Sequence, residues 1–338
     1  IYGSFNKRIT RIMAFSTIDK SSSFMNPVLY TGNASTQSIT GVGFQPDMIW
    51  TKCRGASENH TLVDSVRGDS GANTGYWYLQ PDYDNADASG SGNTLIDAIT
   101  SDGFNVGNND QVNVAQPFAS WNWKAGTTSG ITTNGSTTIT PTGYSFNATS
   151  GFSIVKFTGN ATSAQKIPHG LGVAPKFMML KRLGSTDDWY VYHYGISANP
   201  SSEFLILNTT ASIGNSGGAW SDTEPDSVNF TVGSRTNVNA TDGMIAYCFA
   251  PITGYSKFGS YTGNGQADGT FVYTGFKPSF IICKKTNGAD DWRILTENVN
   301  TRNTATNEVN KNLYAQSNAA ESGTSIDFVS NGMKIRST

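Results

Sequence analysis

Charged side chains are scarce in this 338-residue sequence and make up 14% of it, against about a quarter in typical soluble domains. The formal net charge is −2, and Lys and Arg form no long cluster. Proteins hold a nucleic acid backbone mainly through such cationic clusters. The composition therefore argues against nucleic acid as a partner.

Long hydrophobic runs are also missing. Runs such as FMML at 177–180 are far shorter than the roughly 20 residues that a membrane helix needs, so we expect no membrane insertion. No cleavable apolar leader opens the chain, and we expect any extracellular location to be reached without ordinary secretion.

Cysteine and histidine occur three times each. The odd cysteine count and the lack of a CxxC pair argue against a disulfide framework or a zinc site, and we interpret the cysteines as small buried apolar residues. The histidines show neither metal-ligand spacing nor a nucleophile partner. We therefore expect no cofactor and no metal centre from these residues, which are Cys53, Cys248, Cys283, His60, His169 and His193.

Short apolar segments separated by Gly, Asn, Ser and Thr turns fill the chain, and no amphipathic helical stripe of useful length occurs. This pattern predicts an all-β protein. The stretches GFQPDMIWTK, LGVAPKFMMLK and GFKPSFIICK resemble one another, and their prolines lie 129 and 103 residues apart. Other landmarks keep nearly the same offsets, which indicates three copies of one unit. These landmarks are the YTGN or FTGN motifs at 30–33, 157–160 and 261–264, the lysines Lys52, Lys181 and Lys284, and the rings His60, Trp189 and Trp292.

Two aromatic pairs close the first two units, Trp121 with Trp123 and, 126 residues later, Tyr247 with Phe249. A third pair is expected near position 350, beyond the last residue given. Either a neighbouring subunit completes the third sheet or the sequence is a fragment, which we favour, because native proteins usually cover an open strand edge.

These offsets and the strand pattern predict tandem β-sandwich modules, the third lacking its terminal strand. The expected parts are an N-terminal arm at 1–27, repeat 1 at 28–126, an inserted hairpin or linker at 127–150, repeat 2 at 151–256 and repeat 3 at 257–338.

The strand after each proline is apolar at consecutive positions, as at 48–50, so both of its faces should be covered inside a sandwich. The closing strand alternates instead. We expect Trp121 and Trp123 to face the core, and Ser120, Asn122 and Lys124 to face water.

The ordered motifs VLYTGNASTQSITGVGFQPDMIWTKCR, HTLVDSVRG, SDGFNVGNNDQVN, ASWNWKAG and GYSKFGSYTGNGQADGTFVYTGFKPSFIICKK resemble a repeat family of structural and tail fibre proteins of tailed bacteriophages. The resemblance covers about residues 13–338 and implies lectin-like or jelly-roll β-sandwiches and a place in the virion among other virion subunits. Members often start near MAFSTIDK, here at Met13, so residues 1–12 are either not native or form a docking arm with Lys7, Arg8 and Arg11.

Carbohydrate binding is one hypothesis for the repeated rings, since sugars bind exposed aromatic platforms beside carboxylates and amides. Each tryptophan follows an Asp pair, in STDDWYVY and GADDWRIL. The alternative is that the tryptophan packs into the core while the Asp pair makes a turn. The candidate ligand-binding residues are Asp188, Trp189, Asp291, Trp292 and His60.

Other chemistry has weaker candidates. Asp64 and Glu203 are the candidate carboxylates for glycoside hydrolysis, yet they lie in different units and neither recurs, which argues against a shared catalytic site. Asp82, Asp84 and Asp87 have calcium-loop spacing without the Gly and distal Glu of the full motif, and a solvated turn is the alternative.

We therefore expect a non-enzymatic phage tail fibre or appendage protein that binds host surface polysaccharide. It would form a homo-oligomer, with a trimer as the first expectation, and use many weak sites together. A capsid decoration or shell protein and a polysaccharide depolymerase are the alternatives.

Overall fold

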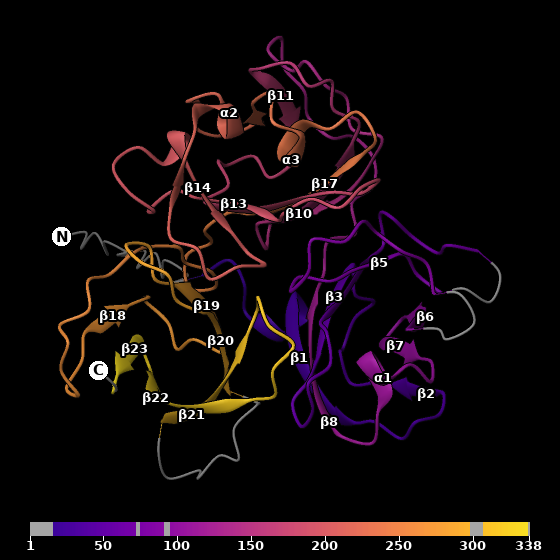
Figure 1. Cartoon of the computed structure of the whole chain (residues 1–338), viewed down its shortest axis with the longest axis vertical. Helices are drawn as coiled ribbons and strands as arrows, with labels where there is room; N and C mark the ends of the chain where they lie inside the picture. Colours follow the sequence, from indigo (N-terminus) through magenta and orange to yellow (C-terminus); the bar gives the residue numbers. More distant parts are fainter. Residues whose placement is uncertain (1–15, 72–74, 91–94, 298–306, 337–338) are drawn as a thin grey trace, which may run out of the picture.

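The computed structural model describes residues 16–71, 75–90, 95–297 and 307–336 (Figure 1). With 38% strand and 6% helix, the structure confirms the predicted all-β class. The three α-helices among these residues have four residues each: α1 (Asp110–Asn113), α2 (Gly217–Trp220) and α3 (Thr236–Asn239). No helix in the described ranges is long and apolar enough to cross a membrane.

Module 1 is a sandwich of two antiparallel sheets. Its main sheet has the order β1 (Met25–Thr31), β8 (Pro117–Trp123), β3 (Met48–Cys53), β4 (Thr61–Asp64) and β5 (Tyr78–Leu79). The smaller sheet has the order β2 (Gln37–Ile39), β7 (Gly103–Val106) and β6 (Ile96–Thr100). Ile49 and Val63 of the main sheet meet Phe104 and Val106 of the smaller sheet, so the two sheets enclose one hydrophobic core.

Module 2 repeats this plan with a longer main sheet. The order is β15 (Gly214–Asn215), β14 (Glu203–Ile206), β13 (Tyr190–His193), β12 (Phe177–Arg182), β17 (Met244–Phe249), β10 (Phe152–Phe157) and β9 (Gly143–Asn147). The pair β11 (Gln165–Pro168) and β16 (Asn229–Val232) covers one face. Strand β9 lies within the segment at 127–150 that was predicted to be an inserted hairpin or a linker. That segment is therefore partly an edge strand of module 2 and not a free connection.

Module 3 consists of one six-stranded sheet. The order is β18 (Phe271–Tyr273), β23 (Gly332–Ile335), β22 (Ser322–Val329), β21 (Glu308–Tyr314), β20 (Trp292–Thr296) and β19 (Phe280–Lys284). The sheet encloses a small core that includes Leu295, Val309 and Phe328.

One hairpin has the same register in all three modules. The first residue of its first strand pairs with a residue sixteen positions later: Met48 with Asp64, Phe177 with His193, and Phe280 with Thr296. Each hairpin begins two residues after its proline, and all three prolines are buried. The repeated decapeptide therefore encodes one structural element in all three modules. The prediction that this strand is covered on both faces is wrong for module 3, where β19 is an edge strand and all five of its residues are half-exposed.

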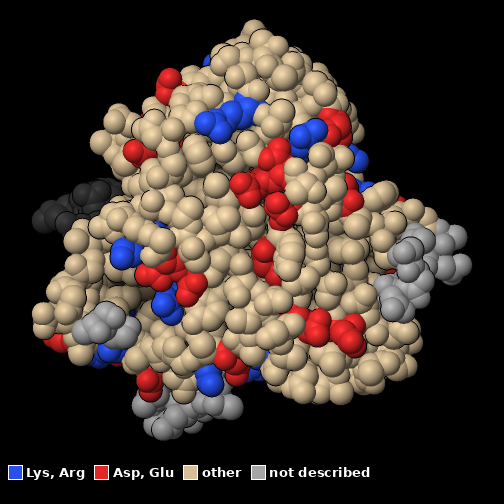
Figure 2. All heavy atoms as spheres, in the orientation of Figure 1, with Lys and Arg blue, Asp and Glu red and all other residues tan. Residues whose placement is uncertain are grey.

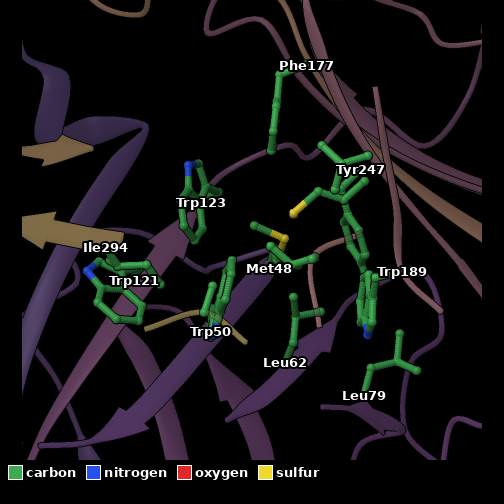
Figure 3. Packing of buried hydrophobic residues seen from close by; sticks show 14 of the residues in the cluster. Met48, Trp50, Leu62, Leu79, Trp121, Trp123, Phe177, Trp189, Tyr247 and Ile294 are labelled. Atoms are coloured by element: carbon green, nitrogen blue, oxygen red, sulfur yellow. The ribbon is translucent and has the colours of Figure 1, made fainter. Parts of the chain in front are cut away.

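The modules surround a shared hydrophobic cluster, here called the central core (Figures 1 and 3). Along β3 the side chains alternate, since Met48 and Trp50 lie in the central core while Ile49 lies in the core of module 1. The prediction that both faces of this strand are covered is correct, but neighbouring modules cover one of them. Because all three modules contribute, they are arranged around a common centre and not as a linear stack. Large side chains in the central core include Trp50, Trp121, Trp123, Phe152, Phe177, Met179, Trp189, Tyr247 and Trp292.

The prediction for the polar face of β8 is wrong. Ser120 and Asn122 are fully buried, and only Lys124, just beyond the strand, is half-exposed. Burial is tolerated because the Asn122 amide donates to the Asn26 carbonyl at 3.0 Å and the Ser120 hydroxyl donates to the Asn122 side-chain oxygen at 3.2 Å.

Candidate functional site

The repeated ring position lies at the joints between modules. His60 and Trp189 have no exposed surface and Trp292 is 3% exposed. Trp189 Nε1 donates to the carbonyls of Gln80 and Tyr83 in module 1, at 3.1 and 3.2 Å. These rings are thus enclosed and cannot form the exposed sugar platform expected of them.

The other two rings make equivalent bonds to the next module. Trp292 Nε1 of module 3 donates to the Ile206 carbonyl of module 2 at 2.9 Å. His60 Nε2 of module 1 lies 2.9 Å from the Tyr314 carbonyl of module 3. The contacts therefore run in a closed cycle, from module 1 to 3, from 3 to 2 and from 2 to 1.

The aspartates beside the tryptophans have a structural role. The Trp189 backbone N–H donates to Asn208 Oδ1 at 3.0 Å, and the Asn208 amide donates to Asp188 at 2.8 Å. In module 3, the Trp292 N–H donates to the Gln316 side chain at 2.8 Å, whose amide donates to Asp291 at 2.6 Å. Each aspartate thus orients an amide that anchors the ring, as in the packing alternative.

His60 is a neutral structural ring. The Trp50 indole donates to its Nδ1 at 2.8 Å, so the remaining proton lies on Nε2 and is donated to Tyr314. Burial, with the neighbouring Lys52 charge, lowers the pKa of His60 to about 3. His60 is therefore uncharged near neutral pH.

The other two histidines also accept backbone hydrogen bonds. The Leu171 N–H donates to His169 Nδ1 at 3.1 Å, and the Gly195 N–H donates to His193 Nδ1 at 3.0 Å. Burial lowers the pKa of both rings to about 4. Both rings lie in module 2, and the Nδ1 atom of each accepts a hydrogen bond from a residue two positions along the chain.

Two of the three repeated lysines reach the same joints, a role that sequence reasoning missed, whereas Lys181 Nζ donates to the Arg182 carbonyl within module 2 at 2.7 Å. Lys52 Nζ donates to the Asn318 carbonyl of module 3 at 3.1 Å, and Lys284 Nζ donates to the Thr210 carbonyl of module 2 at 3.0 Å. Lys52 is fully buried, and burial lowers its pKa to about 8. The recurrence of lysine six residues after each proline marked these positions in the sequence. Which module each lysine contacts could be seen only in the three-dimensional structure.

The two candidate catalytic carboxylates do not meet. Asp64 forms a buried ion pair with Arg67 at 2.6 Å and accepts a hydrogen bond from the Tyr247 hydroxyl of module 2 at 2.7 Å. Burial acts to lower the pKa of Arg67, but the adjacent Asp64 charge outweighs it and the pKa is raised. Glu203 lies on β14 in module 2. Asp64 therefore joins modules 1 and 2 and is not paired with Glu203 across a cleft.

The suspected calcium loop is another joint. Asp82 is buried and accepts the His60 backbone N–H at 3.0 Å, and burial raises its pKa to about 7. The Asp84 carbonyl accepts the Asp187 N–H at 2.7 Å, and the Asp87 N–H donates to the Leu183 carbonyl at 3.0 Å. Within the described ranges, no group of three or more His, Cys, Asp or Glu side chains could hold a metal ion. The loop packs on module 2 and is not the solvated turn of the alternative.

An open cleft of about 660 Å³ lies between module 1 and the segment at 127–150. Its wall is fixed by Asp47, whose carboxylate accepts hydrogen bonds from Ser65 at 2.8 Å, Ser145 at 3.0 Å and the Ala125 N–H at 2.8 Å. The lining includes Gln45, Asp47, Ser65, Lys124 and Tyr144. Its residues come from separate segments, so no contiguous motif marked it.

Charge is thinly spread over the molecular surface. Figure 2 shows acidic and basic side chains in small groups, with most of the visible face uncharged. A face of this kind suits neutral polar ligands better than polyanions.

Comparisons with known proteins place the chain in one family. No curated protein and no solved structure matches it. A family model described as "Domain of unknown function (DUF7483)" matches residues 20–338, which include all three modules. The chain therefore belongs to the DUF7483 family.

Proposed function

We propose that this protein is a non-enzymatic structural component of a bacteriophage particle, in a tail fibre or appendage, and that it contacts host-surface carbohydrate. The observation that carries the proposal is that all three repeated rings form a closed cycle of hydrogen bonds between modules, to which Lys52 and Lys284 add further hydrogen bonds. A chain whose repeated residues join three modules to one another forms a rigid block. Rigid, loop-rich blocks are well suited to adhesion by many weak contacts.

The cleft beside Asp47 is the proposed carbohydrate contact. Its volume of about 660 Å³ is within the usual range for small-ligand sites. Gln45 is exposed and Lys124 half-exposed, so their amide and ammonium groups can bond sugar hydroxyls. Tyr144, whose hydroxyl accepts the Ile131 N–H at 3.3 Å, supplies an apolar ring held in place.

The test is binding of the full chain to immobilised host-cell polysaccharides. We expect saturable binding that falls at least about tenfold in Gln45→Ala and Lys124→Ala, since each removes a hydrogen-bonding group. Lys20→Ala is the matched control, because Lys20 is exposed and outside the cleft. Equal binding by all variants would exclude the cleft as the contact.

Two further measurements separate the proposed role from its alternatives. Polysaccharide incubated with the protein should release no new reducing ends, whereas turnover would indicate a depolymerase. Gold-labelled antibodies on intact particles should mark the tail, and labelling over the head would indicate a decoration or shell protein.

A further inference from the structure

The cleft beside Asp47 is formed in part by a segment that occurs once in the chain. Residues 141–144 line one side of it, and they belong to the stretch at 127–150, which has no counterpart between repeats 2 and 3. This segment is held on module 2, because the Thr142 N–H donates to the Lys156 carbonyl of β10 at 2.8 Å. The remaining lining residues come from module 1 and the residues just after it. The cleft is therefore a local feature of modules 1 and 2.

The carboxylate of Asp47 is fully engaged by the protein. Its Oδ1 accepts hydrogen bonds from the Ser65 and Ser145 hydroxyls, and its Oδ2 accepts the Ala125 N–H. Asp47 is only 9% exposed. Its negative charge is thus stabilised by these three donors within the wall, and Asp47 shapes the cleft instead of binding a ligand there.

The ammonium of Lys124 lies beside the cleft without such partners. Met48 pairs with Trp123, so Asp47 and Lys124 flank this pair on adjacent strands, where oppositely charged side chains commonly form an ion pair. Lys124 takes part in none of the ion pairs found in the described part of the chain. It is half-exposed and is the one cation among the described lining residues. The cleft therefore presents a positive charge that no carboxylate of these residues contacts.

The rest of the lining suits a sugar ring. Val66, Pro141 and Tyr144 are half-buried and offer apolar surface, against which the face of a pyranose can pack. The exposed Gln45 amide can both donate and accept hydrogen bonds. A Cβ on Gly143 would lie 3.1 Å from Val66 Cγ1, so the segment already packs closely on module 1 beside the cleft. The site thus combines an apolar surface, an amide and one cation.

We propose that the sugar bound in this cleft carries a carboxylate, as a uronic acid or another acidic pyranose does, and that the Lys124 ammonium binds this carboxylate. The inference deepens the proposed function, on which it rests, by naming the class of sugar. A hydrogen bond between an ammonium and a carboxylate is stronger than one to a neutral hydroxyl, so the site favours the acidic sugar. Because the face in Figure 2 carries little charge, one carboxylate per bound sugar matches the cleft better than the dense charge of a sulfated polymer.

The ligand side is tested on the host-cell polysaccharides that the full chain binds. Their carboxyl groups are reduced to primary alcohols, which keeps the linkages and the other hydroxyls. We expect binding to fall at least about tenfold after reduction. Methyl glucuronide and a methyl sialoside are then compared with methyl glucoside as soluble competitors. We expect at least one of the two acidic glycosides to displace the polymer at an about tenfold lower concentration than methyl glucoside, and the stronger one identifies the kind of acidic sugar.

The protein side uses two substitutions at one position. Lys124→Gln removes the charge but keeps a hydrogen-bonding side chain, whereas Lys124→Arg keeps the charge. We expect Lys124→Gln to bind the intact polymer at least about tenfold more weakly than the parent, and Lys124→Arg to stay within about threefold of it. All three proteins should bind the reduced polymer within about threefold of one another. Lys20→Gln is the matched control, because Lys20 is exposed and outside the cleft.

The outcomes separate this inference from the proposed function. The acidic-sugar assignment would be overturned, with carbohydrate binding intact, if every polysaccharide that binds lacks carboxyl groups or if reduction leaves binding unchanged. Equal affinity of the parent and Lys124→Gln for the intact polymer would also overturn it. So would equal losses in Lys124→Arg and Lys124→Gln, which would show that the charge is not what matters, or an equal loss in Lys20→Gln. Binding of no polysaccharide at all would overturn both proposals.

Discussion

At the residue scale, the position fourteen residues after each proline accepts either His or Trp because both rings offer an N–H. The donor matters at this position, since each ring bonds a backbone carbonyl of the neighbouring module. The recurrence of an Asp pair before the tryptophans made a sugar platform plausible. Sequence alone could not decide whether these rings form a sugar-binding surface or a contact between modules, because the carbonyl acceptors lie 86 to 254 residues away along the chain.

Trp189→Phe should weaken the joint between modules 2 and 1. The substitution leaves the carbonyls of Gln80 and Tyr83 without their donor, and we expect a loss of about 1–3 kcal/mol in the free energy of unfolding. Denaturant unfolding measures the loss, and amide exchange should rise at 78–80. Trp220→Phe is the control, because that indole donates to Glu203 within module 2. Faster exchange at 78–80 in both variants would contradict the assignment.

His60 should make the fold sensitive to acid. Its pKa is about 3 when folded and near 6.5 when unfolded, so the unfolded state binds more protons between these values and stability falls as the pH drops through this window. The adjacent Asp82 has its pKa raised to about 7 and acts in the opposite direction. Because the two groups oppose each other, the contribution of His60 to the pH dependence of stability must be measured with a variant that removes the histidine.

His60→Gln provides that isolation, because its amide can accept from Trp50 and donate to Tyr314. Between pH 6 and 4, the stability difference between parent and variant should change by about 1.4 kcal/mol per pH unit in favour of the variant. Urea unfolding at several pH values measures it. Parallel curves for the two proteins would show that His60 does not titrate in this way.

At the element scale, the proline-led hairpin was predictable because its residues are contiguous and its pattern is strong. Its consecutive apolar residues implied cover on both faces, which Met48 and Ile49 confirm by facing different cores. The burial of Ser120 and Asn122 was not predictable. Their cost is offset by hydrogen bonds across β8 and β1, and such pairings depend on strand order, which the sequence does not specify.

The loop formed by the TGN motif, at 31–33 in module 1 and 262–264 in module 3, allows a matched comparison between modules. Gly32→Ala should destabilise the protein by about 1–3 kcal/mol, because its Cβ would lie 1.9 Å from a backbone carbonyl oxygen. Gly263→Ala should change stability by less than about 0.5 kcal/mol, since a Cβ there meets nothing within 4 Å. Thermal unfolding of the two variants measures the difference. Equal losses of stability in the two variants would mean that neighbouring atoms surround Gly263 as closely as they surround Gly32.

At the scale of the whole molecule, the sequence predicted three units and their order, but not that they share a core. Trp121 and Trp123 were expected inside their own sandwich, yet they lie in the central core with Phe280 of module 3. Alternation along a strand identifies two faces and cannot say which neighbour covers each. The joints between modules and the cleft beside Asp47 are both formed by residues that are far apart in the sequence. Their positions could therefore be identified only from the structure.

A shared core should make the three modules unfold together. Module 1 in isolation would expose Met48, Trp50, Trp121 and Trp123, which the other modules cover, so the modules depend on one another for burial of apolar surface. Calorimetry of the intact chain should therefore give one transition with matching calorimetric and van't Hoff enthalpies. Trp121→Ala should shift this entire transition, by about 3–5 kcal/mol in the free energy of unfolding. Separate transitions, only one of which moves in the variant, would mean that the central core does not couple the modules.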